Sequence, residues 1–538
     1  MTWSHVRVLE RMQECAPPFS FYFRLIAPYW RARPVEYGPL HRLTSLARKQ
    51  GAQRVVIQDA AIIPSVAEEL DDLDAACGGG GSAEAIAFSF FSEAFSEDDF
   101  GEIPDASLIG RCILINYRRP EDEDFSKTYI YEAIFTTPRI SDGSQSLLNN
   151  FINTEATFKI EILGREFPVT GIYYTQQNGI TSVCAHASIK MVVRTLHPDQ
   201  PTPTNRTINK LILPDNVLEG VLPSKMAAVI EELAGVSVNV LSCEKVDPVS
   251  ILAAATESGD LALLVFKTGV PSPVPTGHRD DAPTIGRRDL RQRTMNHVVV
   301  VFGHTRNSDE WHPQAIPVYA ALPYAAYCPS SSWVDHFVIH DDNFGPYFTL
   351  SSRALENDLT VQAKTILVIR RQPCHISASS AESTASTVLA HMLPTIEAVQ
   401  SDSWLHLTIG RPRTFVTRPV LVTKENYLAH VANMEAHDGS RATESDIAAL
   451  QGIPDLFWMV EFTLADLFTG NRSKLGEVLI EALRTDEHLL DRRRRVIGIR
   501  LPNILLLRDA DQISMPVRPF SIASHVGIYM HRPHDHQW

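Results

Sequence analysis

No stretch of this 538-residue chain is apolar over the length that a membrane-crossing helix needs, which is about 20 residues. The N-terminus also lacks the basic-then-apolar pattern that is typical of a secretory signal peptide. We therefore expect neither a membrane span nor an exported protein.

Cysteine is scarce and is not arranged in Cys-x-x-Cys pairs. The seven cysteines are scattered along the chain at Cys15, Cys77, Cys112, Cys184, Cys243, Cys328 and Cys374. Their odd number and wide spacing argue against a disulfide framework and against a zinc ribbon. We expect free thiols in a reducing compartment, the cytoplasm in the simplest case, with no metal or other cofactor.

Basic residues are in deficit. The chain has 49 Lys and Arg against 63 Asp and Glu, which gives a net charge of −14. Proteins that bind nucleic acid usually carry a basic surface, so this balance argues against that class. A hydrophobic fraction of 44% and a charged fraction of 21% are typical of a globular protein, and the length allows for several domains. The oligomeric state is left open.

The pattern of strands, helices and turns predicts an α+β fold in three parts. We expect an N-terminal mixed α/β domain at residues 1–155, a central domain at residues 156–372 and a C-terminal α/β domain at residues 391–538. The run Ser377–Thr387 contains only Ser, Ala, Glu and Thr. Such a composition is typical of a linker, so residues 373–390 are assigned to one.

Several elements can be predicted within these parts. Leu108–Tyr117 and Lys127–Thr136 are expected to form a hairpin of two strands. Leu475–Leu483 is expected to be a helix. Residues 269–293 form a polar insertion with several prolines between two apolar strands, which makes this insertion a candidate lid.

One cysteine stands out by its position. Cys184 follows a turn that contains Gly, Ser and Thr, and it is the first residue of an apolar segment that is expected to be helical. At a helix N-terminus, unpaired N–H groups and the helix dipole stabilise a thiolate. A thiol nucleophile also needs a base, a group that orients this base, and donors for an oxyanion.

The later part of the chain supplies a candidate base and a candidate orienting group. His297 is followed directly by the apolar run Val298–Phe302, which predicts a buried strand. Asp341 comes at the end of a later strand and is expected to orient the imidazole of His297. Asp342 and Asn343 are possible substitutes for Asp341.

The residues before the cysteine supply the candidate oxyanion donor. Gln177 is expected to donate from its side chain, together with the backbone N–H of Cys184, and Gln176 and Asn178 are the alternatives. His186 lies two residues after the cysteine and is expected at a surface position of the helix.

The order of these residues resembles the papain-like cysteine peptidase superfamily, and most closely the bacteriocin-processing, double-glycine-type peptidases and their cytoplasmic relatives. The segments that carry the resemblance lie within roughly residues 170–350; they are Gln177, Cys184–Ala187, His297–Gly303 and Ile339–Asp342. The resemblance implies a cysteine-bearing helix packed on an antiparallel sheet that carries the His and the Asp. It also implies a cysteine protease or isopeptidase that acts on a peptide or protein substrate through a Cys-His-Asp triad and a thioester acyl-enzyme.

The chain departs from this family in three places. The family commonly has Gly after the cysteine where this chain has Ala185, and its glutamine is usually one residue closer, at the position of Asn178. The separation of His297 and Asp341 exceeds the short hairpin that is usual there, which predicts an insertion. A catalytically inactive, partner-binding module and an acyl-transfer or transglutamination enzyme therefore remain alternatives.

Overall fold

The computed structural model describes most of the chain. The described residues are 5–8, 38–96, 98–119, 126–137, 150–212, 221–268, 295–306, 327–357, 361–410, 415–465, 467–468, 473–483, 495–508 and 515–530. Cys15 and the candidate lid at residues 269–293 lie outside them.

The N-terminal part is a five-stranded antiparallel sheet, and its described residues place one helix on each face. Its elements are β1 (His5–Val8), α2 (Gly38–Lys49), β2 (Arg54–Asp59), α3 (Pro64–Ala76), β3 (Ser82–Phe91), β4 (Leu108–Arg118) and β5 (Ser126–Phe135). Successive strand residues point to opposite faces: Phe88 packs in the core that contains α2, whereas Ala87 packs in the core that contains α3. The predicted hairpin is confirmed as β4 and β5.

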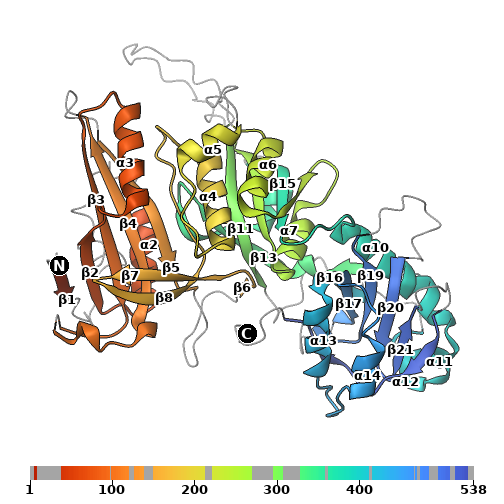
Figure 1. The fold of residues 1–538 in the computed structure, drawn as a ribbon. Coiled ribbons are helices and arrows are strands. Elements are labelled where there is room, and N and C mark those ends of the chain that lie inside the picture. The colour runs from red at the N-terminus through yellow and green to blue at the C-terminus, as the bar shows by residue number, and fades with distance from the viewer. Residues whose placement is uncertain are drawn as a thin grey trace, which may run out of the picture.

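The expected boundary at residue 155 does not separate two cores. Strand β6 (Asn150–Ile152) pairs with a strand of the central sheet, and the hairpin of β7 (Ala156–Ile162) and β8 (Arg165–Gly171) packs against β4 and β5. One hydrophobic core contains residues of both parts, for example Phe90 of the N-terminal sheet and Val300 of the central sheet. The N-terminal sheet is therefore packed onto the central part and does not form a separate unit (Figure 1).

The central sheet has seven strands in the order β14-β13-β11-β10-β15-β9, with β6 also paired to β11, and its described pairings are all antiparallel. Its other strands are β9 (Ser237–Ser242), β10 (Leu261–Thr268), β11 (Met295–Arg306), β13 (Val334–Asp341), β14 (Gly345–Ser351) and β15 (Val361–Arg370). Its helices are α4 (Cys184–Leu196), α5 (Asn205–Ile212), α6 (Pro223–Ala234), α7 (Pro248–Glu257) and α9 (Ser352–Asn357).

Strand β11 is covered on both faces, which explains its run of valines. Val298 and Val300 pack in the core shared with α4 and α6, and Val299 and Val301 pack in the core shared with α7. When both faces of a strand are buried, its sequence is a continuous run of apolar residues and does not alternate between apolar and polar residues.

The C-terminal part is a second seven-stranded sheet, in the order β12-β16-β17-β19-β20-β21-β22. Its strands are β12 (Tyr327–Pro329), β16 (Phe415–Thr423), β17 (Leu456–Thr463), β19 (Gly476–Glu481), β20 (Val496–Leu501), β21 (Ile504–Leu507) and β22 (Val517–Pro519), and β18 (Ser473–Lys474) pairs with β23 (Val526–Gly527). Its helices are α10 (Ala378–Thr387), α11 (Glu397–Ser401), α12 (Ser403–Thr408), α13 (Lys424–Ala432) and α14 (Glu444–Ala449).

The flanking parts differ from the sequence-based expectations. Both were expected to be α/β domains, but of their described strand pairings only that of β12 with β16 is parallel. The helix expected at Leu475–Leu483 is strand β19, because Val478 and Leu479 pack in cores on opposite faces of the sheet. A short apolar run of this kind does not distinguish a strand from a helix by periodicity.

The segment expected to be a linker is helix α10. The Ser377 hydroxyl caps it by accepting a hydrogen bond from the N–H of Ser380, and Ala381 and Ala385, one turn apart, are fully buried. Alanine has the highest helix propensity, and the Glu382 carboxylate accepts a hydrogen bond from the Thr417 hydroxyl at 2.6 Å. The segment therefore belongs to the C-terminal core.

A buried ion-pair cluster joins the central and C-terminal parts. Glu257, at the end of α7, pairs with Arg418 of β16 and lies 3.0 Å from His304 of β11. Arg418 also pairs with Glu461 of β17 at 2.6 Å. Charges buried this deeply are tolerated when they are paired, so the cluster ties the two sheets to each other.

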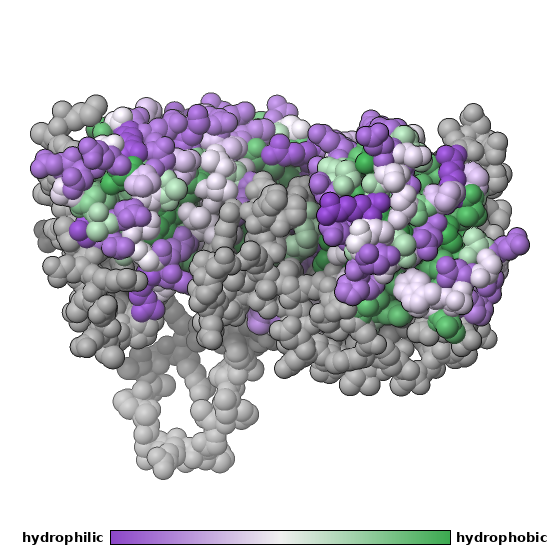
Figure 2. All heavy atoms as spheres, turned by 90° about the horizontal axis from the view of Figure 1, so that it is seen from below, coloured by the Kyte–Doolittle hydropathy of each residue, from purple (hydrophilic) through white to green (hydrophobic). Residues whose placement is uncertain are grey.

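Hydrophilic side chains predominate on the face of the molecule seen in Figure 2, with hydrophobic ones scattered among them. No helix within the described residues has the length and apolar character needed to cross a membrane.

Candidate active site

Cys184 is the first residue of helix α4, and its side chain is half-buried. The turn before it is organised by Asn178, whose side-chain oxygen accepts hydrogen bonds from three backbone N–H groups, those of Ile180, Thr181 and Ser182. This Asx-type turn ends directly at the helix, so it sets where the thiol is presented.

The same turn is held from the N-terminal part by Glu69 of α3. Its carboxylate accepts hydrogen bonds from Asn178 at 3.0 Å, from Tyr129 at 2.9 Å and from Asn205 at 3.1 Å. It also lies 3.5 Å from the ammonium of Lys190 in α4, with both side chains buried. Glu69 therefore connects the N-terminal sheet to the turn and to the helix that carries Cys184.

His297, near the start of β11, is brought to this helix end. Its Nε2 lies 3.1 Å from Oδ2 of Asp341, and Cys184 lies near enough to the ring to raise the pKa of His297. Because Nε2 faces Asp341, Nδ1 is the nitrogen left for the thiol. Burial lowers the pKa of His297, but the hydrogen bond to Asp341, the nearby Cys184 and the charges of Asp341 and Asp342 outweigh burial and raise this pKa to about 10.

Asp341 is fixed by the turn that follows β13. Its Oδ1 accepts hydrogen bonds from the N–H groups of Asn343 at 2.8 Å and Phe344 at 3.2 Å, which leaves Oδ2 for His297. The two substitutes lie slightly farther from Nε2 of His297: Asp342 Oδ1 at 3.5 Å and the Asn343 side-chain nitrogen at 3.4 Å. All three candidates are therefore at the imidazole, and Asp341 has the geometry of the orienting group.

The three candidate oxyanion donors are separated by the fold. The Gln176 side-chain oxygen accepts a hydrogen bond from the N–H of Ile130, and the Asn178 amide is used in the turn and at Glu69. The Gln177 side-chain nitrogen donates to Asn343 Oδ1 at 3.3 Å, at the turn that also faces His297. Gln177 is therefore the one of the three whose amide faces the site.

His186 was expected at the surface, and this expectation is wrong. It is fully buried, its Nε2 lies 2.8 Å from the Asn209 side chain of α5, and its Nδ1 faces the N–H of Val183. Burial lowers the pKa of His186. It therefore helps to cap α4 and to hold α5 beside it.

Three contributors to the site were missed at the sequence level. The first is Glu69, which lies in an acidic run of the sequence. The second is Arg42, which donates to the backbone oxygens of Pro346 and Tyr347 after the turn at Asp341. The third is Phe266, whose ring packs edge-on against that of His297 with 5.4 Å between the ring centres. None of them has a local sequence signal, because their roles depend on contacts with distant segments.

The same side chains also carry atoms that could bind a metal ion. Within the described residues, His297, Asp341 and Asp342 form a group whose ligand atoms lie within 4.8 Å of one another. A metal on Nε2 of His297 would have to replace the hydrogen bond from this nitrogen to Asp341. The base role and the ligand role are thus mutually exclusive, and the nearby thiol of Cys184, which raises the pKa of His297, favours the base role.

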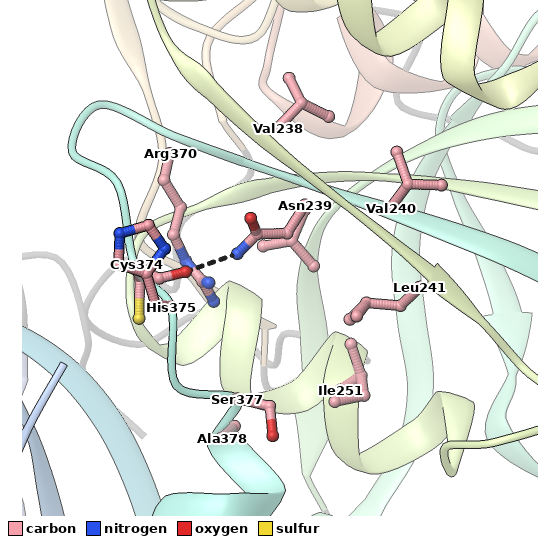
Figure 3. Close-up of a pocket in the computed structure, with 11 residues that line it drawn as sticks. Val238, Asn239, Val240, Leu241, Ile251, Arg370, Cys374, His375, Ser377 and Ala378 are labelled. Atoms are coloured by element: carbon pink, nitrogen blue, oxygen red, sulfur yellow. Dashed lines mark hydrogen bonds between the residues drawn. The ribbon is translucent and has the colours of Figure 1, made fainter. Parts of the chain in front are cut away.

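A pocket of about 310 Å³ lies apart from these residues. Strand β9, helix α7 and the segment before α10 line it, and the Asn239 side chain donates to the Cys374 backbone oxygen at 3.0 Å (Figure 3). None of the candidate catalytic residues lines this pocket, so it has no part in the triad.

Comparisons with protein-family models, with curated protein sequences and with solved structures find no match. The geometry around Cys184 is therefore the basis on which a function can be assigned.

Proposed function

We propose that this protein is a cysteine protease or isopeptidase that cleaves a peptide or protein substrate through a thioester acyl-enzyme. The observation that carries the proposal is the meeting of Cys184, His297 and Asp341, which come from a helix start, a strand start and a strand end. A thiol, an imidazole and a carboxylate in this order are the parts that thiol-based acyl chemistry needs.

Each residue has a defined step. The Cys184 thiolate attacks the carbonyl carbon of the scissile bond, and the imidazolium of His297 gives its proton to the leaving amine as the C–N bond breaks. Water then attacks the thioester while neutral His297 takes a proton from it, which releases the acid and restores the thiol pair. Asp341 keeps the ring oriented and stabilises its charged form.

The oxyanion of each tetrahedral intermediate needs donors. Cys184 is the first helical residue, so its backbone N–H needs no partner within α4 and can donate to that oxygen. The second donor is the Gln177 amide, which has to leave Asn343 or rotate to reach the substrate.

The departure at Ala185 does not obstruct this role. Ala185 is buried in the core shared by α4 and the central sheet, so its methyl group is accommodated by the packing there. The six described cysteines are all free, which fits a reducing compartment such as the cytoplasm.

The first test compares the reactivity of the cysteines. The full-length protein is treated at pH 7 with a limiting amount of iodoacetamide, and alkylation of each cysteine is quantified by peptide mass spectrometry. We expect Cys184 to react first, ahead of Cys77 and Cys243, which are also half-buried. Burial raises the pKa of Cys243 to about 11, so it is a suitable reference.

The second test measures turnover on a peptide library. Cys184→Ala should abolish cleavage, whereas the matched control Cys243→Ala should retain it. If Cys184 reacts no faster than Cys77 and Cys243, the proposal fails. If acyl groups pass to added amines in preference to water, the enzyme is an acyltransferase on the same scaffold.

A further inference from the structure

The carboxylate of Asp342 is buried and is not hydrogen-bonded to another residue of the described chain. The residue is 2% exposed, and neither Oδ1 nor Oδ2 accepts a hydrogen bond from a neighbouring described residue. Desolvation of an ionised carboxylate is costly, so buried carboxylates are normally paired or hydrogen-bonded. A side chain left in this state calls for an explanation in terms of function.

The position of Asp342 supplies that explanation. Its Oδ1 lies 3.5 Å from Nε2 of His297, the nitrogen that Asp341 already holds at 3.1 Å. An imidazolium has one N–H at Nε2, and the better-placed Asp341 accepts it. Asp342 thus acts on the ring through its charge and not through a hydrogen bond.

The groups that face the two carboxylates come from several elements. His297 of β11 interacts with both of them, and it also interacts with Cys184 of α4. Tyr174 lies between β8 and α4. Burial, and to a lesser extent the charges of Asp342 and Asp341, raise its pKa well above the ordinary value, so Tyr174 stays neutral. Arg42 of α2 is bound to backbone oxygens of the following turn.

Two negative charges beside one imidazolium leave the cluster with an excess of negative charge. Burial raises the pKa of Asp342 to about 7, and the charge of Asp341 adds to this, while His297 opposes it. Asp342 therefore changes its charge in the neutral range. This makes it the variable member of the cluster.

We propose that Asp342 is a second carboxylate that controls the charge of His297, so that the Cys184–His297 pair is fully activated only when Asp342 is ionised. This inference rests on the proposed function, because it assigns Asp342 as a positioning residue for the base of that site. Ionised Asp342 stabilises the imidazolium and hence the thiolate that pairs with it. Protonation of Asp342 removes one of the two charges that hold the proton on the ring.

The proposal predicts a particular pH profile. The rate constant for alkylation of Cys184 by iodoacetamide, a neutral reagent, should fall as the pH drops through about 7, where Asp342 takes up its proton. Asp342→Asn should lack this step, and at pH 8 it should react more slowly than the parent, because only one carboxylate then stabilises the imidazolium that pairs with the thiolate. Asp342→Glu keeps the charge and should restore the step.

A second measurement does not depend on a reactive thiol. In full-length protein carrying Cys184→Ala, the titration of His297 is followed by NMR with labelled histidine, and its signal is identified by its absence in His297→Ala. Adding Asp342→Asn should lower the pKa of His297 by about one unit or more. The melting temperature of each variant shows whether it is folded.

The outcomes separate the two proposals. If Asp342→Asn leaves the pKa of His297 unchanged, Asp342 has no control over the base and the inference is wrong. If the alkylation profile keeps its step near pH 7 in this variant, the inference is also wrong. If Cys184 is no more reactive than the other cysteines but the His297 titration moves as expected, the inference stands and the proposed hydrolase function fails.

Discussion

Glu69 accepts a hydrogen bond from Asn178 at 3.0 Å, and this contact joins the N-terminal sheet to the turn before Cys184. Asn178 in turn binds three successive backbone N–H groups that lead to Cys184. The N-terminal part therefore contributes directly to the candidate active site, although no residue of it was among the candidates.

Replacement of Glu69 tests this connection. Glu69→Gln removes the charge that faces the buried Lys190 and weakens the acceptor used by Asn178 and Asn205. We expect the free energy of unfolding to fall by about 3 kcal/mol, since the lysine is left buried without a counter-charge, and Cys184 to be alkylated more slowly. Chemical denaturation and alkylation rates measure the two effects.

The control is Asp71→Asn on the exposed side of the same helix, α3. This variant should change the free energy of unfolding by less than about 0.5 kcal/mol and leave Cys184 unaffected. Equal effects of the two substitutions would contradict the role given to Glu69.

The adjacent glutamines provide a second prediction. Gln177→Ala should lower kcat about 100-fold, the effect of losing one oxyanion donor, while the alkylation rate of Cys184 stays close to that of the parent. Gln176→Ala should keep kcat, because the Gln176 side chain is engaged with the backbone of Ile130. A larger loss of kcat in Gln176→Ala than in Gln177→Ala would reverse the assignment.

Asp342 predicts a pH dependence of stability with a definite sign. Its pKa is raised from 3.8 to about 7 in the folded state, so the folded protein binds a proton there that the unfolded chain has lost. Asp342 therefore does not destabilise the folded state below about pH 4. Its unfavourable contribution to the free energy of unfolding grows as the pH rises and is complete above about pH 7. Asp342→Asn should therefore increase the free energy of unfolding at pH 8, by an amount on the order of 4 kcal/mol, and have little effect at pH 4. Denaturation at the two pH values measures this difference, and an equal effect at both would contradict it.

Gly345 predicts a local effect on the orienting turn. It has φ of +114°, and a Cβ at this position would lie 3.0 Å from Cβ of Arg42, the side chain that holds the turn after Asp341. Gly345→Ala should cost about 1–3 kcal/mol of stability and slow the alkylation of Cys184. The matched control is Gly439→Ala, which also has positive φ but no atom within 4 Å of the added Cβ. It should lose stability without a change at Cys184, and loss of reactivity in both variants would show a global effect.

The helix start at Cys184 and the buried strand after His297 were predictable because both have strong local signals. A turn followed by an apolar run predicts a helix N-terminus, and four valines in succession predict a strand covered on both faces. The same kind of signal misled at β19, where an apolar run with two covered faces was taken for a helix. Composition misled at α10: the segment has a composition typical of linkers, but it forms a helix whose buried face contains alanines.

The order of Cys184, His297 and Asp341 along the chain, and the reaction class to which that order points, come from the sequence alone, because each residue sits at a locally recognisable element boundary. Tertiary structure alone decided that Gln177 and not Gln176 or Asn178 faces the site, that His186 is buried, and that Glu69 holds the turn. It also placed the buried carboxylate of Asp342 beside His297. These outcomes depend on which distant segments pack together and on which buried polar atoms find partners, and no local pattern encodes either.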